Sequence, residues 1–275
     1  MEEAENFYLV LPSNSSMTYY NDNTTTCFTT QLAREMRLTG DWSVGLVEIH
    51  IPCTIMHLRR EDAYVVFKYD DSVVEEDEEQ GTSPIADGIY ETLEDLAKTI
   101  RSHPDLQDHL LFEKTPNSEG FYSVEQKCTC SVVHSFAFSE KLRQIFGFES
   151  KEKEKMKFET KTFAPSMISR TSPVIADRPA SLCRAIPDQL YVYTDVVIPY
   201  TVGDTQASLL RIISLDTKKY KFGANVVKNF APVHYIPLLH HSFRSIVIDI
   251  RDAFGQRIPF EYGTLTVTLH FRRNR

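Results

Sequence analysis

A stretch near the C-terminus, TLTVTLHFRR from Thr264 to Arg273, alternates strictly between apolar and polar residues. Successive side chains of an extended strand point to opposite faces, so this alternation predicts a β-strand with one buried and one solvated face. The residues expected to face inward are Leu265, Val267, Leu269 and Phe271. Those expected to face outward are Thr264, Thr266, Thr268 and His270.

A second alternating stretch precedes it and places Ile246, Ile248 and Ile250 on one face. Between the two stretches lie the turn residues Asp252 to Gly255 and then Pro259, which cannot donate to a strand ladder. We therefore interpret residues 246–273 as a closing β-hairpin. Burial of its large apolar side chains stabilises the fold by several kcal/mol, at about 25 cal/mol per Å².

Further strand-like runs give about eight strands, four before a different middle region and four after it. In the run WSVGLVEIHIP, one face carries Trp42, Val44 and Leu46 and the other carries Val47, Ile49 and Ile51, which predicts a strand buried on both sides. The count of eight predicts a mainly β protein, a single jelly-roll sandwich of antiparallel strands. An eight-stranded, lipocalin-like barrel has the same count and stays open at this point.

The middle region changes character. It begins with an acidic stretch of residues 71–84, interpreted as a solvated linker. A helix is expected after Thr92 as N-cap, and a short helix between Ser139 and Gly147. We therefore expect an inserted small α+β subdomain. The predicted division is 1–70 with 188–275 for the sandwich and 71–187 for the linker, the subdomain and the return linker.

Charge and cysteine content restrict the partners and the compartment. The formal charge is −8, which argues against binding nucleic acid through net charge. No signal peptide or transmembrane run is recognisable, so neither export nor membrane contact is expected. An odd number of widely spaced cysteines indicates free thiols in a reducing compartment; these are Cys27, Cys53, Cys128, Cys130 and Cys183.

Known catalytic and phosphate-binding patterns are missing from the sequence, so no enzyme activity is expected. Cys128 and Cys130 are the nearest to a metal pair, but no second ligand pair follows at zinc spacing. His240 and His241 are adjacent, so in a strand their rings would point apart. We therefore nominate no catalytic, cofactor-binding or metal-ligating residue, no cofactor and no small-molecule substrate.

Two surface features remain as candidates for binding. The basic end formed by Arg272, Arg273 and Arg275 is either a solvated terminus or a contact for nucleic acid or an acidic neighbour. The pair Tyr19-Tyr20 lies in a turn-rich stretch and is a candidate aromatic contact of a glycan- or receptor-binding module.

Ordered blocks along nearly the whole chain resemble the penton (minor capsid) proteins of Polinton/Maverick elements and related adintoviruses. The first block is FYLVLPSNSSMTYYNDNTTTCFTTQLAREMRLTGDWSVGLVEIHIP, beginning at Phe7. The later blocks are FSEKLRQIFGF, LYVYTDVVIPYTVGDTQASLLRII and IDIRDAFGQRIPFEYGTLTVTLHFRR.

This resemblance implies a structural protein rather than an enzyme. A member would form homo-pentamers at the five-fold vertices of an icosahedral virion capsid, beside a double jelly-roll major capsid protein. It would be made inside the host cell and would need no cofactor. The resemblance transfers no catalytic residue, and the chain has no Arg-Gly-Asp tripeptide that would imply a receptor loop.

Overall fold

The computed structural model describes residues 5–69, 80–116, 119–127, 133–148, 173–217 and 219–274. The chain divides into two compact units. The first comprises Met1–Ile55 with Pro187–Arg275, and the second is Met56–Ile186, inserted in the first. The sequence-based division at 70 and 188 therefore differs from the division by contacts at its first boundary.

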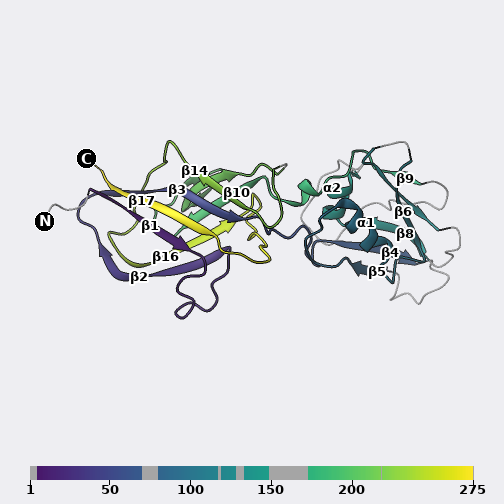
Figure 1. Ribbon diagram of the computed structural model, residues 1–275, viewed down its shortest axis with the longest axis horizontal. Coiled ribbons are helices and arrows are strands. Elements are labelled where there is room, and N and C mark those ends of the chain that lie inside the picture. The colour runs from purple at the N-terminus through teal and green to yellow at the C-terminus, as the bar shows by residue number, and fades with distance from the viewer. Residues whose placement is uncertain are drawn as a thin grey trace. The chain divides into compact units, whose positions relative to one another are not determined.

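The first unit contains two antiparallel sheets (Figure 1). The first sheet has the order β1 (Asn6–Pro12), β17 (Thr266–Arg273), β3 (Trp42–Pro52) and β14 (Asn225–Asn229), with β15 (Ile236–Pro237) also paired to β3. The second sheet has the order β13 (Leu209–Ser214), β10 (Gln189–Thr194), β16 (Ser242–Arg251) and β2 (Cys27–Arg37). A separate hairpin joins β11 (Tyr200–Val202) to β12 (Thr205–Ala207).

The strand order identifies the architecture. Of the eight principal strands, the first, eighth, third and sixth form one sheet, and the fifth, fourth, seventh and second form the other. The chain therefore changes sheet at every step except from β10 to β13. Two four-stranded sheets connected in this way form a jelly roll, which confirms the predicted fold class over the barrel.

The two alternating stretches at the C-terminal end form the core as predicted. Their inward-facing side chains are fully buried: Ile246, Ile248, Ile250, Leu265, Val267, Leu269 and Phe271. The prediction that they form one hairpin is wrong. β16 pairs with β2 and β10, whereas β17 pairs with β1 and β3. The connection between them, which contains Pro259, carries the chain from one sheet to the other.

Strand β3 also differs from its prediction. Val44, Leu46, Ile49 and Ile51 are all fully buried, although the alternation places the first two and the last two on opposite faces. The register against β17 shifts between Thr268, opposite Glu48, and Leu269, opposite Leu46. Val47 is thus an extra residue, a β-bulge that reverses which parity faces the core.

The predicted four strands before the insertion and four after it are three and five in the structure. The run expected as the fourth strand is β4 (Tyr64–Tyr69), which lies in the second unit. Strand β14 was missed because Asn225–Asn229 is short and flanked by asparagines, which are depleted in strands.

The second unit combines two small antiparallel sheets with helices, as the α+β expectation required. One sheet has the order β5 (Gln80–Pro84), β4 and β8 (Val133–Phe138), and the other has β6 (Leu110–Lys114), β7 (Tyr122–Gln126) and β9 (Val174–Ile175). The helical elements are α1 (Leu93–Arg101), α2 (Glu140–Phe146) and the 3-10 helix η2 (Leu182–Ala185).

The three predicted helix boundaries, at Thr92, Ser139 and Gly147, are confirmed. Thr92 and Asp95 form a capping box at the start of α1. Gly147 ends α2 in the left-handed region, with φ 83°. An aromatic cluster packs against α2, in which the ring of Phe112 contacts those of Tyr122, Phe138 and Phe146. None of the described helices is long and apolar enough to cross a membrane.

Candidate functional site

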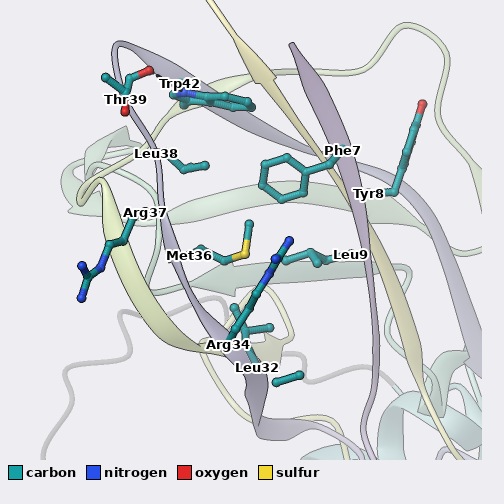
Figure 2. Close-up of a pocket in the computed structure, with 11 residues that line it drawn as sticks. Phe7, Tyr8, Leu9, Leu32, Arg34, Met36, Arg37, Leu38, Thr39 and Trp42 are labelled. Carbon is teal, nitrogen blue, oxygen red and sulfur yellow. Dashed lines mark hydrogen bonds between the residues drawn. The ribbon is translucent and has the colours of Figure 1, made fainter. Parts of the chain in front are cut away.

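One side of the sandwich is open between the edge strands β1 and β2, and a groove of about 510 Å³ lies there (Figure 2). We call it the edge groove. Its lining is mostly apolar and consists of Phe7, Tyr8, Leu9, Leu32, Ala33, Arg34, Met36, Arg37, Leu38, Thr39 and Trp42.

Strand β2, which forms one wall of the edge groove, is irregular where it pairs with β16. Met36 pairs with Phe243, but the next pair joins Gln31 to Ser245. Strand β2 therefore advances five residues while β16 advances two, and three extra residues bulge out of the sheet. Bulges of this kind bend the strand that carries them, here at the wall of the groove.

The sequence of β1 leaves both of its faces apolar. Phe7 and Leu9 are half-buried and line the groove, whereas Tyr8 and Val10 are 59% and 60% exposed. Figure 2 shows Phe7 and Tyr8 pointing to opposite sides of the strand. Leu11 lies on the same face as Phe7 and Leu9 and is buried. The alternation of the β1 sequence does not show that β1 is an edge strand.

The charged side chains of the groove lining are both arginines. Arg37 is held by Glu35, with Nη2 at 2.6 Å from Oε2. The same glutamate accepts a hydrogen bond from the Ser242 hydroxyl, and these two contacts lower the pKa of Glu35. Arg34 is exposed and has no ion-pair partner among the described residues. The groove is therefore apolar with a net positive rim.

On the outer face of the first sheet, an aromatic stack surrounds His270. The ring of Tyr8 stacks on the imidazole at 4.3 Å, and the Tyr235 hydroxyl lies 2.7 Å from Nδ1. Burial and the nearby Arg272 lower the pKa of His270. The imidazole is therefore neutral at neutral pH, and a proton on it would face Arg272.

The structure gives the basic end a specific contact. The guanidinium of Arg272 lies 3.6 Å above the ring of Tyr235, a cation–π contact. The backbone N–H of Arg273 bonds to the carbonyl of Glu5 at 2.9 Å. Arg275 lies outside the described residues. Arg272 and Arg273 are thus fixed against neighbouring parts of the sandwich.

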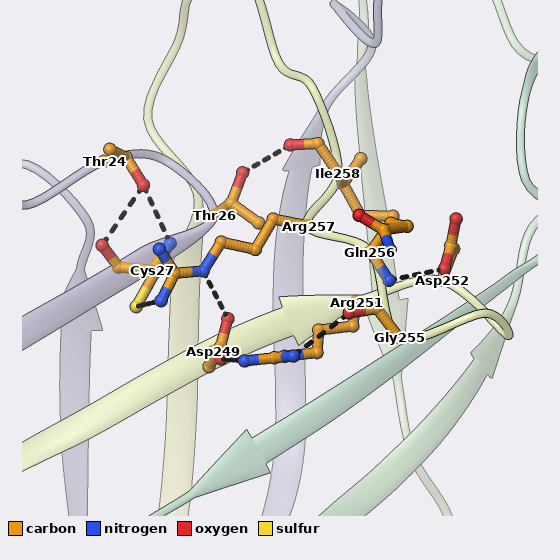
Figure 3. A network of polar contacts seen from close by, with 10 residues as sticks. All are labelled: Thr24, Thr26, Cys27, Asp249, Arg251, Asp252, Gly255, Gln256, Arg257 and Ile258. Carbon is orange, nitrogen blue, oxygen red and sulfur yellow. Dashed lines mark hydrogen bonds and ion pairs between the residues drawn. The ribbon is translucent and has the colours of Figure 1, made fainter. Parts of the chain in front are cut away.

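The loop after β16 is braced by polar contacts (Figure 3). Asp249 binds Arg251 at 2.7 Å and Arg257 at 3.4 Å, and Arg257 also donates to the Cys27 sulfur at 3.1 Å. Burial first, and then Asp249, raises the pKa of the Cys27 thiol. The thiol is therefore protonated at neutral pH and does not act as a nucleophile there.

The tip of this loop exposes a large side chain. The Asp252 carboxylate accepts hydrogen bonds from the backbone N–H groups of Phe254 and Gln256, at 2.8 and 2.9 Å. Arg251 donates to the carbonyl of Gly255 at 3.0 Å. Phe254 nevertheless remains 89% exposed. An apolar ring on a braced turn loses little entropy when a partner covers it.

Other residues singled out in the sequence are not brought together. His240 and His241 are both exposed. Cys128 and Cys130 lie outside the described residues. Among the described cysteines, Cys27 and Cys53 are free thiols. Within the described ranges, no group of three or more His, Cys, Asp or Glu residues is placed to hold a metal ion.

Tyr19 and Tyr20 lie in different environments. The Tyr20 hydroxyl donates to the Gln31 side chain at 3.0 Å, whereas Tyr19 is 73% exposed. The loop is held by Asn23, whose amide donates to the carbonyls of Ser15 and Thr29. Tyr19 is therefore displayed on an ordered loop.

These features define the class: a single jelly-roll protein with a second unit inserted between β3 and β10, and with exposed apolar groups at one sandwich edge and on two loops. No family model and no curated protein matches the chain.

Two solved structures are similar to it. A crystal structure of the selenomethionine-labelled mavirus penton protein is 11% identical and covers 97% of this chain and 99% of its own, with a TM-score of 0.46. A cryo-EM structure of the Sputnik virophage is 12% identical and covers 98% of each chain, with a TM-score of 0.48.

Proposed function

We propose that the chain is a viral minor capsid protein, a penton that forms homo-pentamers at the five-fold vertices of an icosahedral capsid. The observation that carries this proposal is the jelly-roll strand order, with a whole unit inserted between β3 and β10. Jelly rolls of this type recur in viral capsids. The resemblance of ordered sequence blocks to Polinton/Maverick pentons supports the same conclusion.

Five-fold closure places a physical demand on the sandwich. A ring of identical subunits needs a heterologous interface, in which two different surfaces of each copy meet. The first unit offers several surfaces with exposed apolar residues, among them Tyr8 and Val10 on β1, Tyr262, and Phe254 on its braced loop. This distribution fits a subunit that is covered on more than one side.

The partners and the location follow from the same resemblance. The neighbours of each pentamer would be a double jelly-roll major capsid protein, and the location would be the virion capsid, with synthesis inside the host cell and no export. The protein would act without catalysis, cofactor, small-molecule substrate or membrane. Nucleic acid would be contacted, if at all, through Arg272 and the residues that follow it.

The test is the mass of the full chain in solution, measured by size-exclusion chromatography with light scattering over a wide concentration range. We expect a particle of five times the chain mass, formed by the chain alone or only after the major capsid protein is added. We also expect five-fold rings in negative-stain images. A chain that stays monomeric at every concentration and does not bind the major capsid protein contradicts the proposal.

A glycan- or receptor-binding module is the second candidate, and exposed Tyr19 on its ordered loop is the observation that favours it. Aromatic rings of this kind can stack on sugars or on partner side chains. Binding on a glycan array that Tyr19→Ala abolishes, while Tyr20→Phe retains it, would support this candidate. An array without a signal would dismiss glycan binding.

A further inference from the structure

Strand β1 ends the first sheet. Among the described strands it pairs with β17 alone, so its other side presents an unpaired row of backbone N–H and C=O groups. Natural sheets protect such edges with charged residues, prolines, bulges or shortness. Strand β1 carries no charged residue, and its sequence between Asn6 and Pro12 is FYLVL.

The opposite edge of the same sheet shows the contrast. Strand β14 has five residues against seven in β1, carries Lys228 and has an asparagine at each end. Its exposed apolar residue, Val227, is thus followed directly by a charge. The first sheet is therefore protected at one edge and unprotected at the other.

The edge groove lies on the inner side of the unprotected edge. A strand added beside β1 would turn alternate side chains toward the groove and the others toward the outer face, beside Tyr8 and Val10. The groove volume of about 510 Å³ is large enough for apolar side chains of such a strand. An isolated small molecule would fill the groove but would leave the backbone row of β1 unpaired.

The charge at the edge groove indicates which kind of peptide segment would bind beside β1. Arg34 is exposed at the groove without an ion-pair partner among the described residues, and the charge of Arg37 is already paired with Glu35. A carboxylate next to the apolar side chains would pair with Arg34, whereas a lysine would be repelled. Apolar residues alternating with acidic ones therefore fit this edge.

We propose that β1 and the edge groove bind an extended, acidic and apolar segment of another protein chain, which adds to the first sheet as a strand beside β1. Backbone hydrogen bonds supply affinity in this mode of recognition, and the groove and Arg34 supply specificity. The inference stands on the edge itself and does not depend on the proposed capsid function.

A fluorescein-labelled peptide of alternating leucine and glutamate is the probe, titrated with the full chain and followed by fluorescence anisotropy. A peptide of alternating leucine and lysine is the charge control. We expect the acidic peptide to bind with its leucines toward the groove and its glutamates beside residue 10, so Val10→Glu on the exposed face of β1 should weaken binding about tenfold or more. The matched control is Val227→Glu on β14, which makes the same change at the other edge and leaves affinity unchanged.

Arg34→Glu tests the charge. It should weaken binding of the acidic peptide and strengthen binding of the lysine peptide. Hydrogen exchange supplies the structural readout, because an added strand slows exchange of β1 amides whereas a peptide held only by its side chains does not.

Three results would overturn the proposal. One is no binding of either peptide up to millimolar concentration. Another is equal affinity of the acidic peptide for the wild type, Val10→Glu and Arg34→Glu. The third is self-association of the chain through β1, shown by a dimer that Val10→Glu dissociates, because a second copy would then occupy this edge.

Discussion

The Nδ1 atom of His57 accepts a hydrogen bond from the backbone N–H of Tyr90, 3.0 Å away, where the chain turns toward helix α1. This bond requires a neutral imidazole, because a protonated Nδ1 has no lone pair to accept it. Burial of the ring, and then the charge of Lys141, lower the pKa of His57 below its usual value of about 6.5.

The second unit should therefore lose stability in acid. Below about pH 6.5, His57 binds a proton in the unfolded chain but not in the folded chain. The free energy of unfolding therefore falls as the pH falls toward the pKa of His57 in the folded state. Denaturant unfolding at pH 7.5 and pH 5 measures the loss. His57→Gln should reduce the pH dependence, whereas replacing exposed His234 by Gln should not. Equal pH dependence in all three proteins would contradict this assignment.

Deleting Val47 should leave the sandwich folded. Without the extra residue, Val44, Leu46, Ile49 and Ile51 alternate regularly with polar or small residues and all still face the core. The contrast is deletion of His50, which makes Ile49 and Ile51 adjacent and turns one of them to the opposite face, since a one-residue shift reverses the side chains that follow. Circular dichroism and thermal unfolding distinguish the two variants. Loss of the cooperative unfolding transition in the Val47 deletion would show that the bulge itself is required.

Gly147→Ala should destabilise the second unit strongly. A Cβ there would lie 2.1 Å from the backbone oxygen of Arg178, and φ 83° is strained for alanine. Gly223→Ala isolates the second effect, because its φ is 77° and no atom lies within 4 Å of the added carbon. We expect the control to cost about 1 kcal/mol and Gly147→Ala clearly more, measured by urea unfolding. Equal costs would mean that the Arg178 segment moves aside.

Asp252→Ala should loosen the loop that displays Phe254. The substitution removes the acceptor of two backbone N–H groups, which costs about 1 kcal/mol for a turn of this kind. Amide exchange at Phe254 and Gln256 should speed up. Asp252→Asn keeps a side-chain oxygen and should retain most of the protection; if it behaves like alanine, the charge rather than the acceptor holds the turn.

The sequence predicted the elements better than their connections. The alternation at Leu265 to Phe271 identifies a strand and its buried face, because period two is a local property. It does not identify the partner strand, and the two neighbouring stretches at the C-terminal end therefore read as a hairpin although they belong to different sheets. Pairing depends on residues more than two hundred positions away, such as Phe7 opposite Phe271.

The sequence did not predict the bulge at Val47 or the edge groove, for a related reason. Periodicity assumes that every residue advances the strand by one step, and a residue inserted against one partner breaks that assumption without a change in composition. Phe7 and Leu9 share the face that lines the groove, as alternation along a strand requires, but the position of β1 at an edge is a property of the assembled sheet. The one local sign was the absence of charge between Asn6 and Pro12.

The position of β17 between β1 and β3 has a consequence for synthesis. The central strand of the first sheet leaves the ribosome after all the other strands, so β1 and β3 wait for it while the intervening chain is translated. The second unit, made from one continuous segment, has all its residues much earlier. A chain interrupted before residue 266 would therefore carry a complete second unit on an open, unfinished sandwich, a natural target for chaperones and proteases.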